Sequence, residues 1–274
     1  MTHKPWDYLE WDSEKISNLW NFASQWPPYQ NEYFSRMVGK GIINFLKDTI
    51  SIKGNVLDFG CGPGYLVQHL LDNKISCEGV DFSEDSISAV NALFKENSFW
   101  KGAKVYSNGQ LPYPDNYFDL ITCIETIEHL KDKDLDTILN EFYRILKPKT
   151  GELFITTPNH EDLSMDMVFC PQCQQVFHKY QHIRSFSQES LFELMEQKKF
   201  STDLCNSTTF NFFQENRYSQ AISLVISIIK SAINRGDTRT PSMPNNKLAK
   251  QAGFIFNQQI GRGPHLFWLG KKTD

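Results

Sequence analysis

The chain has 274 residues, of which 40% are hydrophobic and 22% are charged. This composition is ordinary for a globular protein and excludes a mainly disordered chain, a collagen-like repeat and a coiled coil. The formal net charge of −4 leaves no overall basic field that could hold a phosphate backbone, so nucleic acid is a disfavoured partner.

The length exceeds the roughly 150 to 200 residues that one α/β domain of nucleotide-binding type needs. Residues 1–35 carry four of the six tryptophans and are predicted to form an aromatic N-terminal cap. Residues 36–274 are predicted to form a single domain with two elaborations, a Cys/His loop at 159–185 and a helical insertion at 211–263. We expect these additions to form a ligand pocket on the one domain rather than a second domain.

The N-terminus has no apolar segment typical of a signal peptide. Three of the six cysteines, Cys61, Cys77 and Cys123, lie in or beside predicted buried strands, which indicates reduced thiols and a cytoplasmic location. The longest apolar run, 221–233, is shorter than the roughly 20 residues that span a bilayer. We predict a buried or lid helix there, with a membrane-surface or homodimer-contact helix as the alternative.

Strands and helices alternate through the first half of the chain. A helix is expected at 36–50, where apolar residues recur at helical spacing. The elements expected after it are a strand at 55–59, a helix at 65–73, a strand at 76–80, a helix at 83–96 with Ser83 as its N-cap, strands at 103–106 and 117–124, a helix at 132–146 and a strand at 152–157. This alternation predicts a parallel, doubly wound α/β sheet with helices on both faces. A helix at 187–198 and strands at 200–210 and 265–271 follow the Cys/His loop.

The first strand ends in a glycine-rich turn over residues 60–64, Gly-Cys-Gly-Pro-Gly. Glycine allows a sharp turn and the close approach of a ligand, and the helix that follows offers free N–H groups. Asp58 precedes the turn, where a carboxylate would face a cation. Asp81 ends the next strand at the distance where an acidic residue binds ribose hydroxyls, and Phe82 after it suits an adenine ring.

These segments resemble the class I S-adenosylmethionine-dependent methyltransferases, in VLDFGCGPGYL at 56–66, GVDFS at 79–83, and the stretches 108–130 and 141–159. The resemblance implies a Rossmann-like sheet of seven mostly parallel strands in the order 3-2-1-4-5-7-6, with the seventh strand antiparallel. It also implies S-adenosylmethionine lying across the carboxyl ends of the first two strands. The cofactor-binding residues that it implies are Asp58, Gly60, Cys61, Gly62, Gly64, Asp81, Phe82, Asn108, Gly109 and Ile124.

The fourth strand ends in an E-x-x-E-H pattern formed by Glu125, Glu128 and His129. One helical turn would place all three on one side, at the edge where parallel sheets bind ligands. Two carboxylates and an imidazole suit Mg²⁺ or Mn²⁺, although the pattern could also be structural. It resembles that of two metal-dependent groups, the ubiquinone-pathway O-methyltransferases and the small-RNA 3′-terminal 2′-O-methyltransferases. The likeness to the RNA enzymes implies a further histidine, matched by His182 or His160.

The 159–185 loop contains a C-x2-C-x4-H-x3-H spacing, formed by Cys170, Cys173, His178 and His182. Four sulfur and nitrogen ligands at this spacing predict a structural Zn²⁺ site, with plain reduced thiols or redox chemistry as alternatives. His182 cannot serve both this site and the E-x-x-E-H cluster.

The sequence therefore predicts an S-adenosylmethionine-dependent enzyme that methylates a hydroxyl of a small molecule, such as a sugar or a natural product, with help from a divalent cation. His129, His160 or His182 could accept the hydroxyl proton. The alternatives are an RNA 2′-O-methyltransferase, an N- or C-methyltransferase of a small molecule, and a cofactor-binding subunit without activity.

Overall fold

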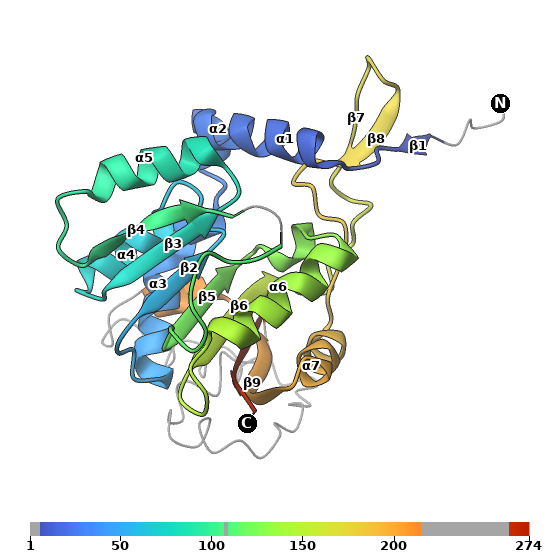
Figure 1. The fold of residues 1–274 in the computed structure, drawn as a ribbon. Coiled ribbons are helices and arrows are strands. Elements are labelled where there is room, and N and C mark those ends of the chain that lie inside the picture. The colour runs from blue at the N-terminus through green and yellow to red at the C-terminus, as the bar shows by residue number, and fades with distance from the viewer. Residues whose placement is uncertain (1–5, 107–108, 215–262, 274) are drawn as a thin grey trace, which may run out of the picture.

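The computed structural model of the protein describes residues 6–106, 109–214 and 263–273. A seven-stranded sheet lies between two layers of helices, and a smaller sheet projects from the body beside the N-terminal helices (Figure 1). The strands of the large sheet are, in spatial order, β4 (Trp100–Val105), β3 (Cys77–Asp81), β2 (Val56–Phe59), β5 (Leu120–Ile124), β6 (Glu152–Pro158), β10 (His265–Lys272) and β9 (Phe200–Thr208).

The strand order confirms the predicted order 3-2-1-4-5-7-6. The first five strands run parallel, and β10 runs antiparallel to both β6 and β9. All four residues of β2 are buried, as expected for a central strand that helices cover on both faces.

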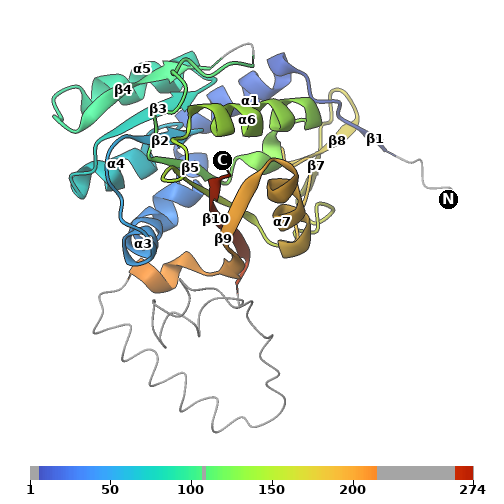
Figure 2. The same cartoon turned by 60° about the horizontal axis from the view of Figure 1, so that its bottom comes forward.

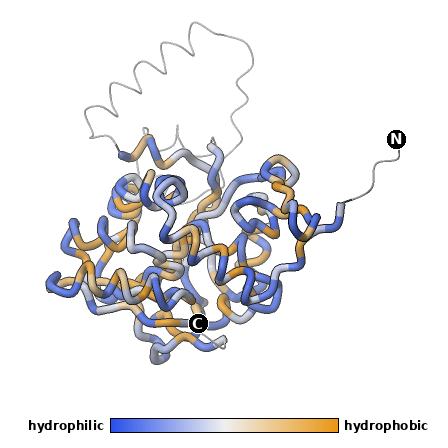
Figure 3. Tube along the Cα trace, turned by 90° about the horizontal axis from the view of Figure 1, so that it is seen from above, coloured by the Kyte–Doolittle hydropathy of each residue, from blue (hydrophilic) through white to orange (hydrophobic). Residues whose placement is uncertain are grey.

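Two apolar layers hold the helices to the sheet. One face packs against α3 (Phe34–Thr49), α4 (Tyr65–Asp72), α5 (Glu84–Phe94) and the 3₁₀ helix η2 (Phe210–Gln214). The other face packs against α6 (Asp132–Ile145) and α7 (Gln188–Gln197). Figure 2 shows α3 and α7 on opposite sides of β10 and β9. Hydrophobic and hydrophilic residues alternate along the coils of the helices, which is the pattern of helices with one buried face (Figure 3).

Helix boundaries follow the local signals in the sequence. Ser83 caps α5, since its hydroxyl accepts a hydrogen bond from the Ser86 N–H at 3.2 Å. The third strand begins three residues earlier than predicted, at Trp100. Its apolar periodicity is interrupted at Gly102, which has a φ of +97°, and its pairing with β3 shifts in register.

The N-terminal segment forms α1 (Ser13–Gln25) and α2 (Pro27–Gln30). Before them, β1 (Asp7–Tyr8) pairs in parallel with β8 (Gln175–His178), which pairs antiparallel with β7 (Met167–Phe169). The predicted Cys/His loop at 159–185 therefore contains two short strands that the sequence did not indicate. Strands of two to four residues, one of them supplied from far away in the chain, leave no periodic signal in the sequence.

All six cysteines are free thiols, and Cys61, Cys77 and Cys123 are buried as expected. The apolar run 221–233 and most of the predicted insertion at 211–263 lie outside the described residues. Among the helices that the structure describes, none combines the length and apolar character needed to cross a membrane.

Candidate active site

A cavity of about 1530 Å³ opens at the carboxyl edge of the parallel strands. Its floor comes from the turns that follow β2, β3, β5 and β6, and its walls come from α1, α2 and the start of α3. Turns at this edge are where open parallel sheets place their ligands. The fold therefore brings the two predicted motifs, the glycine turn and the E-x-x-E-H pattern, into one space.

The glycine turn is held by backbone hydrogen bonds to β3. Gly60 and Gly62 have φ values of +73° and +46°, and a Cβ atom on Gly60 would lie 2.8 Å from the Thr126 hydroxyl. The N–H groups of Gly60 and Cys61 donate to the Val80 carbonyl at 2.9 and 3.1 Å. The turn therefore needs glycine for its conformation and for space against the next strand.

The Asp81 carboxylate stabilises the same turn from the side. Its Oδ2 atom accepts from the Gly62 N–H and its Oδ1 atom from the Ser83 N–H, both at 2.9 Å. Burial raises the pKa of Asp81 above its usual value, although these N–H groups oppose the shift. Each carboxylate oxygen keeps a lone pair, and the side chain lines the cavity, so the geometry fits a ligand with two adjacent hydroxyls.

Most of the cofactor-binding residues that the resemblance implies do line the cavity: Gly60, Cys61, Gly62, Asp81, Phe82, Gly109 and Ile124. Asn108 lies outside the described residues.

Asp58 and Gly64 are not among the lining residues, because each is engaged inside the fold. Asp58 is buried within β2, where its Oδ1 accepts from the Thr122 hydroxyl at 2.9 Å, and burial raises its pKa to about 7. A Cβ atom on Gly64 would lie 2.5 Å from the Val90 side chain, so Gly64 leaves space for this α5 side chain beside the start of α4.

Aromatic side chains from the N-terminal helices close the cavity on one side, among them Trp20, Tyr29 and Tyr33. The Trp20 ring meets the His129 ring edge-on, with 4.8 Å between their centroids, and its Nε1 atom donates to Gln181 Oε1 at 2.9 Å. Tyr29 donates from its hydroxyl to the Lys179 carbonyl at 2.8 Å. These bonds fasten the N-terminal segment to the chain that leaves β8.

The E-x-x-E-H pattern does not form the single turn that its spacing predicts. Glu125 has a φ of +43°, and the 3₁₀ helix η1 (Ile127–His129) begins only two residues later. The left-handed backbone interrupts the helical turn, and the Glu125 Oε2 atom lies 3.3 Å from His265 Nδ1. Glu125 remains near Glu128, but it does not belong to the group of possible cation ligands that contains Glu128 and His129.

Glu128 is completely buried beside His129. Its Oε2 atom accepts from the Thr157 hydroxyl at 3.1 Å, while its Oε1 atom has no hydrogen-bond partner among the described residues and lies 4.0 Å from His129 Nε2. Burial, and then the nearby charge of Glu125, raise the pKa of Glu128 well above its usual value. Burial also lowers the pKa of His129 to about 3, so this imidazole is neutral near pH 7.

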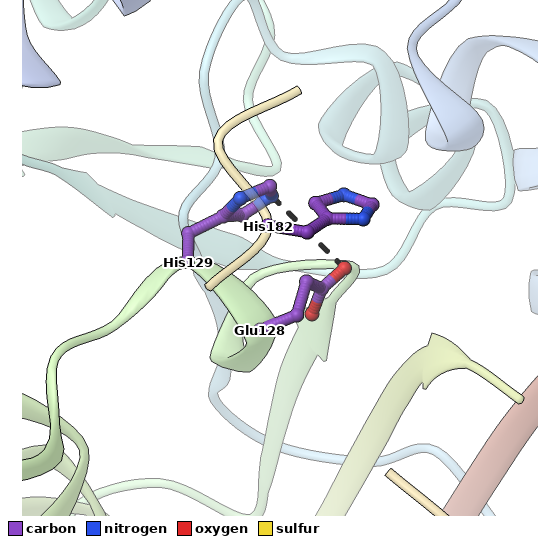
Figure 4. A group of neighbouring side chains, drawn as sticks. All are labelled: Glu128, His129 and His182. Atoms are coloured by element: carbon purple, nitrogen blue, oxygen red, sulfur yellow. Dashed lines mark ion pairs between the residues drawn. The ribbon is translucent and has the colours of Figure 1, made fainter. Parts of the chain in front are cut away.

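His182 completes a group with Glu128 and His129 (Figure 4). One ligand atom from each of the three residues lies within 4.8 Å of the others, and the Ile183 N–H donates to the Glu128 carbonyl at 3.1 Å. This backbone bond brings His182 from the 159–185 segment to the end of β5. His160, by contrast, is exposed and is not among the residues that line the cavity.

The group fits a divalent cation. Two imidazoles and a carboxylate are donors that suit Mn²⁺, Zn²⁺ or a similar ion better than Mg²⁺, which prefers oxygen ligands. The unpartnered Oε1 atom of Glu128 is a buried acceptor that a cation would satisfy.

The predicted zinc ligands lie at opposite ends of a hairpin. The Cys170 N–H donates to the Gln175 carbonyl at 2.9 Å, which closes the turn between β7 and β8 and places Cys170 and Cys173 at its tip. His178 pairs with Met167 at the other end of the hairpin. In the described part of the chain, the residue groups close enough to share a cation contain no cysteine.

A second group, formed by Glu161, His178 and His182, lies next to the first. Glu161 was not among the predicted site residues. Its only signal was an acidic residue shortly after the fifth strand, at the edge where ligands bind.

Comparison with known proteins identifies related sequences and folds. Residues 29–203 match the methyltransferase domain family. Over 133 residues the chain is 32% identical to ajmaline N-methyltransferase of Rauvolfia serpentina, with 46% of this chain and 43% of that protein covered. Over 113 residues it is 33% identical to the mitochondrial ubiquinone biosynthesis O-methyltransferase of Saccharomyces cerevisiae, with 40% and 35% covered.

The matched segment therefore spans less than half of either of these curated relatives. A solved Thermotoga maritima structure, described as a possible histamine N-methyltransferase, has a similar fold with a TM-score of 0.54. The two chains are 19% identical, and the alignment covers 93% of this chain and all of the other.

Proposed function

The chain belongs to the methyltransferase domain family, whose cofactor is S-adenosylmethionine, and from this premise we propose that it methylates a hydroxyl of a small-molecule acceptor. One observation carries the proposal. His129 and His182 line the same cavity as the glycine turn and Asp81, and the buried Glu128 lies behind them with a ligand atom within 4.8 Å of theirs, so a group that could hold a cation borders the space next to the proposed cofactor position.

The cofactor would lie over the carboxyl ends of β2 and β3. Asp81 would accept from both ribose hydroxyls, the turn at Gly60 and Gly62 would contact the methionine part, and the half-exposed Phe82 ring would lie against the adenine. The residues around the cavity fit this placement because the glycines have no side chain that would block it.

Glu128, His129 and His182 would hold a divalent cation at the acceptor side. Bound S-adenosylmethionine supplies an activated methyl group, and a bound cation lowers the pKa of a hydroxyl that it contacts. The protein residues then orient the acceptor, exclude water and take up its proton. The low pKa of His129 suits its role as a ligand, because the imidazole is neutral near pH 7 and a metal ligand must be deprotonated.

The acceptor pocket would be built by the segments that extend beyond the sheet. The 1–35 region contributes Trp20 and Tyr29, and the 159–185 region contributes His182, so both lie around one space. Aromatic walls suit a sugar or an aromatic metabolite, and the net charge of −4 argues against an RNA acceptor.

The proposal is tested by incubating the purified chain with deuteromethyl S-adenosylmethionine and a panel of hydroxylated sugars and phenols, with and without Mn²⁺. Mass spectrometry would detect the label, and NMR of the product would locate it. A methyl ether whose formation increases with Mn²⁺ is the expected result. Methylation only at nitrogen or carbon would overturn the O-methyl assignment. The Asp81→Ala variant is the control for cofactor dependence.

A small-molecule amine is the second candidate acceptor, because carboxylates dominate the charged lining of the cavity. Two lysines, Lys131 and Lys133, also line it. The acidic lining residues are Glu32, Asp81, Glu125, Asp134, Glu141 and Glu161. Such a surface attracts a cationic amine, and the Rauvolfia relative is named as an N-methyltransferase. Amines in the same panel would separate the two candidates.

A further inference from the structure

Glu161 makes the shortest polar contact among the histidines of the cavity. Its Oε2 atom lies 2.6 Å from His182 Nδ1. Its other oxygen, Oε1, lies 3.6 Å from His178 Nε2. One carboxylate, from the segment after β6, thus faces two imidazoles. Both imidazoles belong to the chain at the end of the β7–β8 hairpin.

The contact fixes which nitrogen of His182 carries the proton. A carboxylate at 2.6 Å accepts a hydrogen bond, so Nδ1 must be the protonated nitrogen of a neutral His182 ring. The lone pair then stays on Nε2, the nitrogen on the far side of the ring. The ring lies beside His129, with 4.8 Å between the two centroids, and in reach of Glu128.

His178 supports this arrangement and is not itself a cation ligand. The His182 backbone N–H donates to His178 Nδ1 at 3.2 Å, so that nitrogen holds a lone pair and Nε2 holds the proton of the neutral ring. His178 is 3% exposed, and its Nε2 atom has no hydrogen-bond partner in the described part of the chain, with Glu161 as the facing carboxylate. Its ring stacks on His182 with 4.7 Å between centroids and 20° between planes.

These hydrogen bonds also decide between the two groups of potential ligands. A cation on Glu161, His178 and His182 would need a lone pair on His178 Nε2, which the neutral ring can offer only by giving up the bond at Nδ1. A cation on Glu128, His129 and His182 needs no such change, and it would satisfy the unpartnered Oε1 atom of Glu128.

We propose that Glu161 is a positioning residue that holds His182 in its Nδ1–H form, with Nε2 presented to a divalent cation on Glu128 and His129. The inference rests on the cation site of the proposed function. A carboxylate on the second nitrogen of a ligating histidine fixes its orientation and makes it a better donor. Loss of such a partner typically weakens metal affinity roughly 10- to 100-fold.

The test compares Mn²⁺ binding to the full chain and its variants, followed by electron paramagnetic resonance of the free ion. Glu161→Gln should weaken Mn²⁺ binding 10- to 100-fold. Glu161→Asp, which retains the carboxylate, should recover part of the loss. Affinity for S-adenosylhomocysteine, measured by calorimetry, should not change, whereas general unfolding would reduce both. Asp162→Asn is the matched control, because it removes a carboxylate of the same charge from the neighbouring position. The Asp162 side chain is exposed and accepts hydrogen bonds from the Ser164 N–H and hydroxyl.

Three outcomes would contradict the inference in different ways. Mn²⁺ binding that Glu161→Gln leaves unchanged would overturn the role of Glu161 alone. If Mn²⁺ binding were lost in His178→Asn and retained in Glu128→Gln, the cation would lie on Glu161, His178 and His182. That result would overturn the assignment of the His182 and His178 tautomers. Wild-type protein that binds no Mn²⁺ would overturn the cation site of the proposed function together with this inference.

Discussion

The cavity has two sides that are built in different ways. The cofactor edge, formed by residues 60–62 and 81–83, comes from two consecutive strands and is joined by backbone hydrogen bonds. The histidine wall comes from three separate segments and is joined mainly through side chains: His129, Glu161 and His182 line the cavity, and the buried Glu128 and His178 lie behind them. The cofactor edge could be predicted from one local motif. In the histidine wall the resemblance matched His182 to Glu128 and His129, but no pattern in the sequence pointed to Glu161.

The largest effect should follow from Asp81→Ala, which tests the cofactor edge. The substitution removes the acceptor of the Gly62 and Ser83 N–H groups, and with it the proposed acceptor for both ribose hydroxyls. Hydrogen bonds to charged groups contribute roughly 1.5 to 3 kcal/mol each, so two lost bonds should weaken S-adenosylmethionine binding about 100-fold or more. Isothermal titration calorimetry measures this directly. Unchanged affinity would remove the cofactor from this side of the cavity.

Glu128→Gln is the corresponding change in the histidine wall. It should abolish Mn²⁺ binding and raise the stability of the metal-free protein. It removes the only carboxylate of the Glu128, His129 and His182 group, so Mn²⁺ binding should be lost. It also replaces a fully buried carboxyl whose pKa burial raises and whose Oε1 atom has no partner among the described residues. The unfolded chain ionises this carboxyl at lower pH than the folded protein does, so the wild type loses stability as pH rises.

The metal-free Glu128→Gln protein should therefore melt higher than wild type at pH 8, by at least about 2 °C if 1 kcal/mol is regained. Calorimetry with a chelator present measures the difference, and the same scan at pH 5 should show a smaller one. A variant that melts lower at both pH values would indicate that the charge of Glu128 stabilises the fold without a cation.

Asp58→Asn tests a residue that precedes the cofactor edge in the sequence. Asp58 belongs to the glycine-turn motif, but it does not line the cavity. Burial raises its pKa from 3.8 to about 7, so the folded protein holds a proton that the unfolded chain has already released. Stability contributed by this group is present below pH 4 and is lost as pH rises to 7. The slope is at most about 1.4 kcal/mol per pH unit.

Urea unfolding at pH 5 and pH 7 should show a smaller loss of stability for Asp58→Asn than for wild type. The affinity for S-adenosylmethionine should change less than it does in Asp81→Ala. A tenfold or larger loss of cofactor affinity would instead return Asp58 to the cavity and to the role that the resemblance implied.

The same distinction explains how much of the protein the sequence predicts. The alternation of strands and helices and the position of Asp81 follow from hydrophobic periodicity, glycine spacing and an acidic residue at the end of a strand, whereas the strand order follows from the family resemblance that these motifs carry. The positions of Glu125 and Glu161 do not. A left-handed backbone at Glu125 interrupts the expected helical face, and Glu161 contacts His182 across 21 residues that contain the β7–β8 hairpin. Neither the backbone conformation of Glu125 nor the contact of Glu161 leaves a pattern in the sequence.

The smallest expected effect is that of Cys173→Ser, which tests whether the two hairpin cysteines belong to the same metal site as the histidines. The sequence spacing joins Cys170 and Cys173 to the two histidines, whereas the hairpin places the thiols at its tip and His178 at its base. The Cys173 side chain is exposed, so its replacement should leave both stability and bound metal unchanged. Metal content measured by plasma mass spectrometry would decide, with His182→Asn as the variant expected to lose metal. If Cys173→Ser released zinc while His182→Asn retained it, a metal would sit at the hairpin tip, and the spacing would have identified a site separate from the cavity.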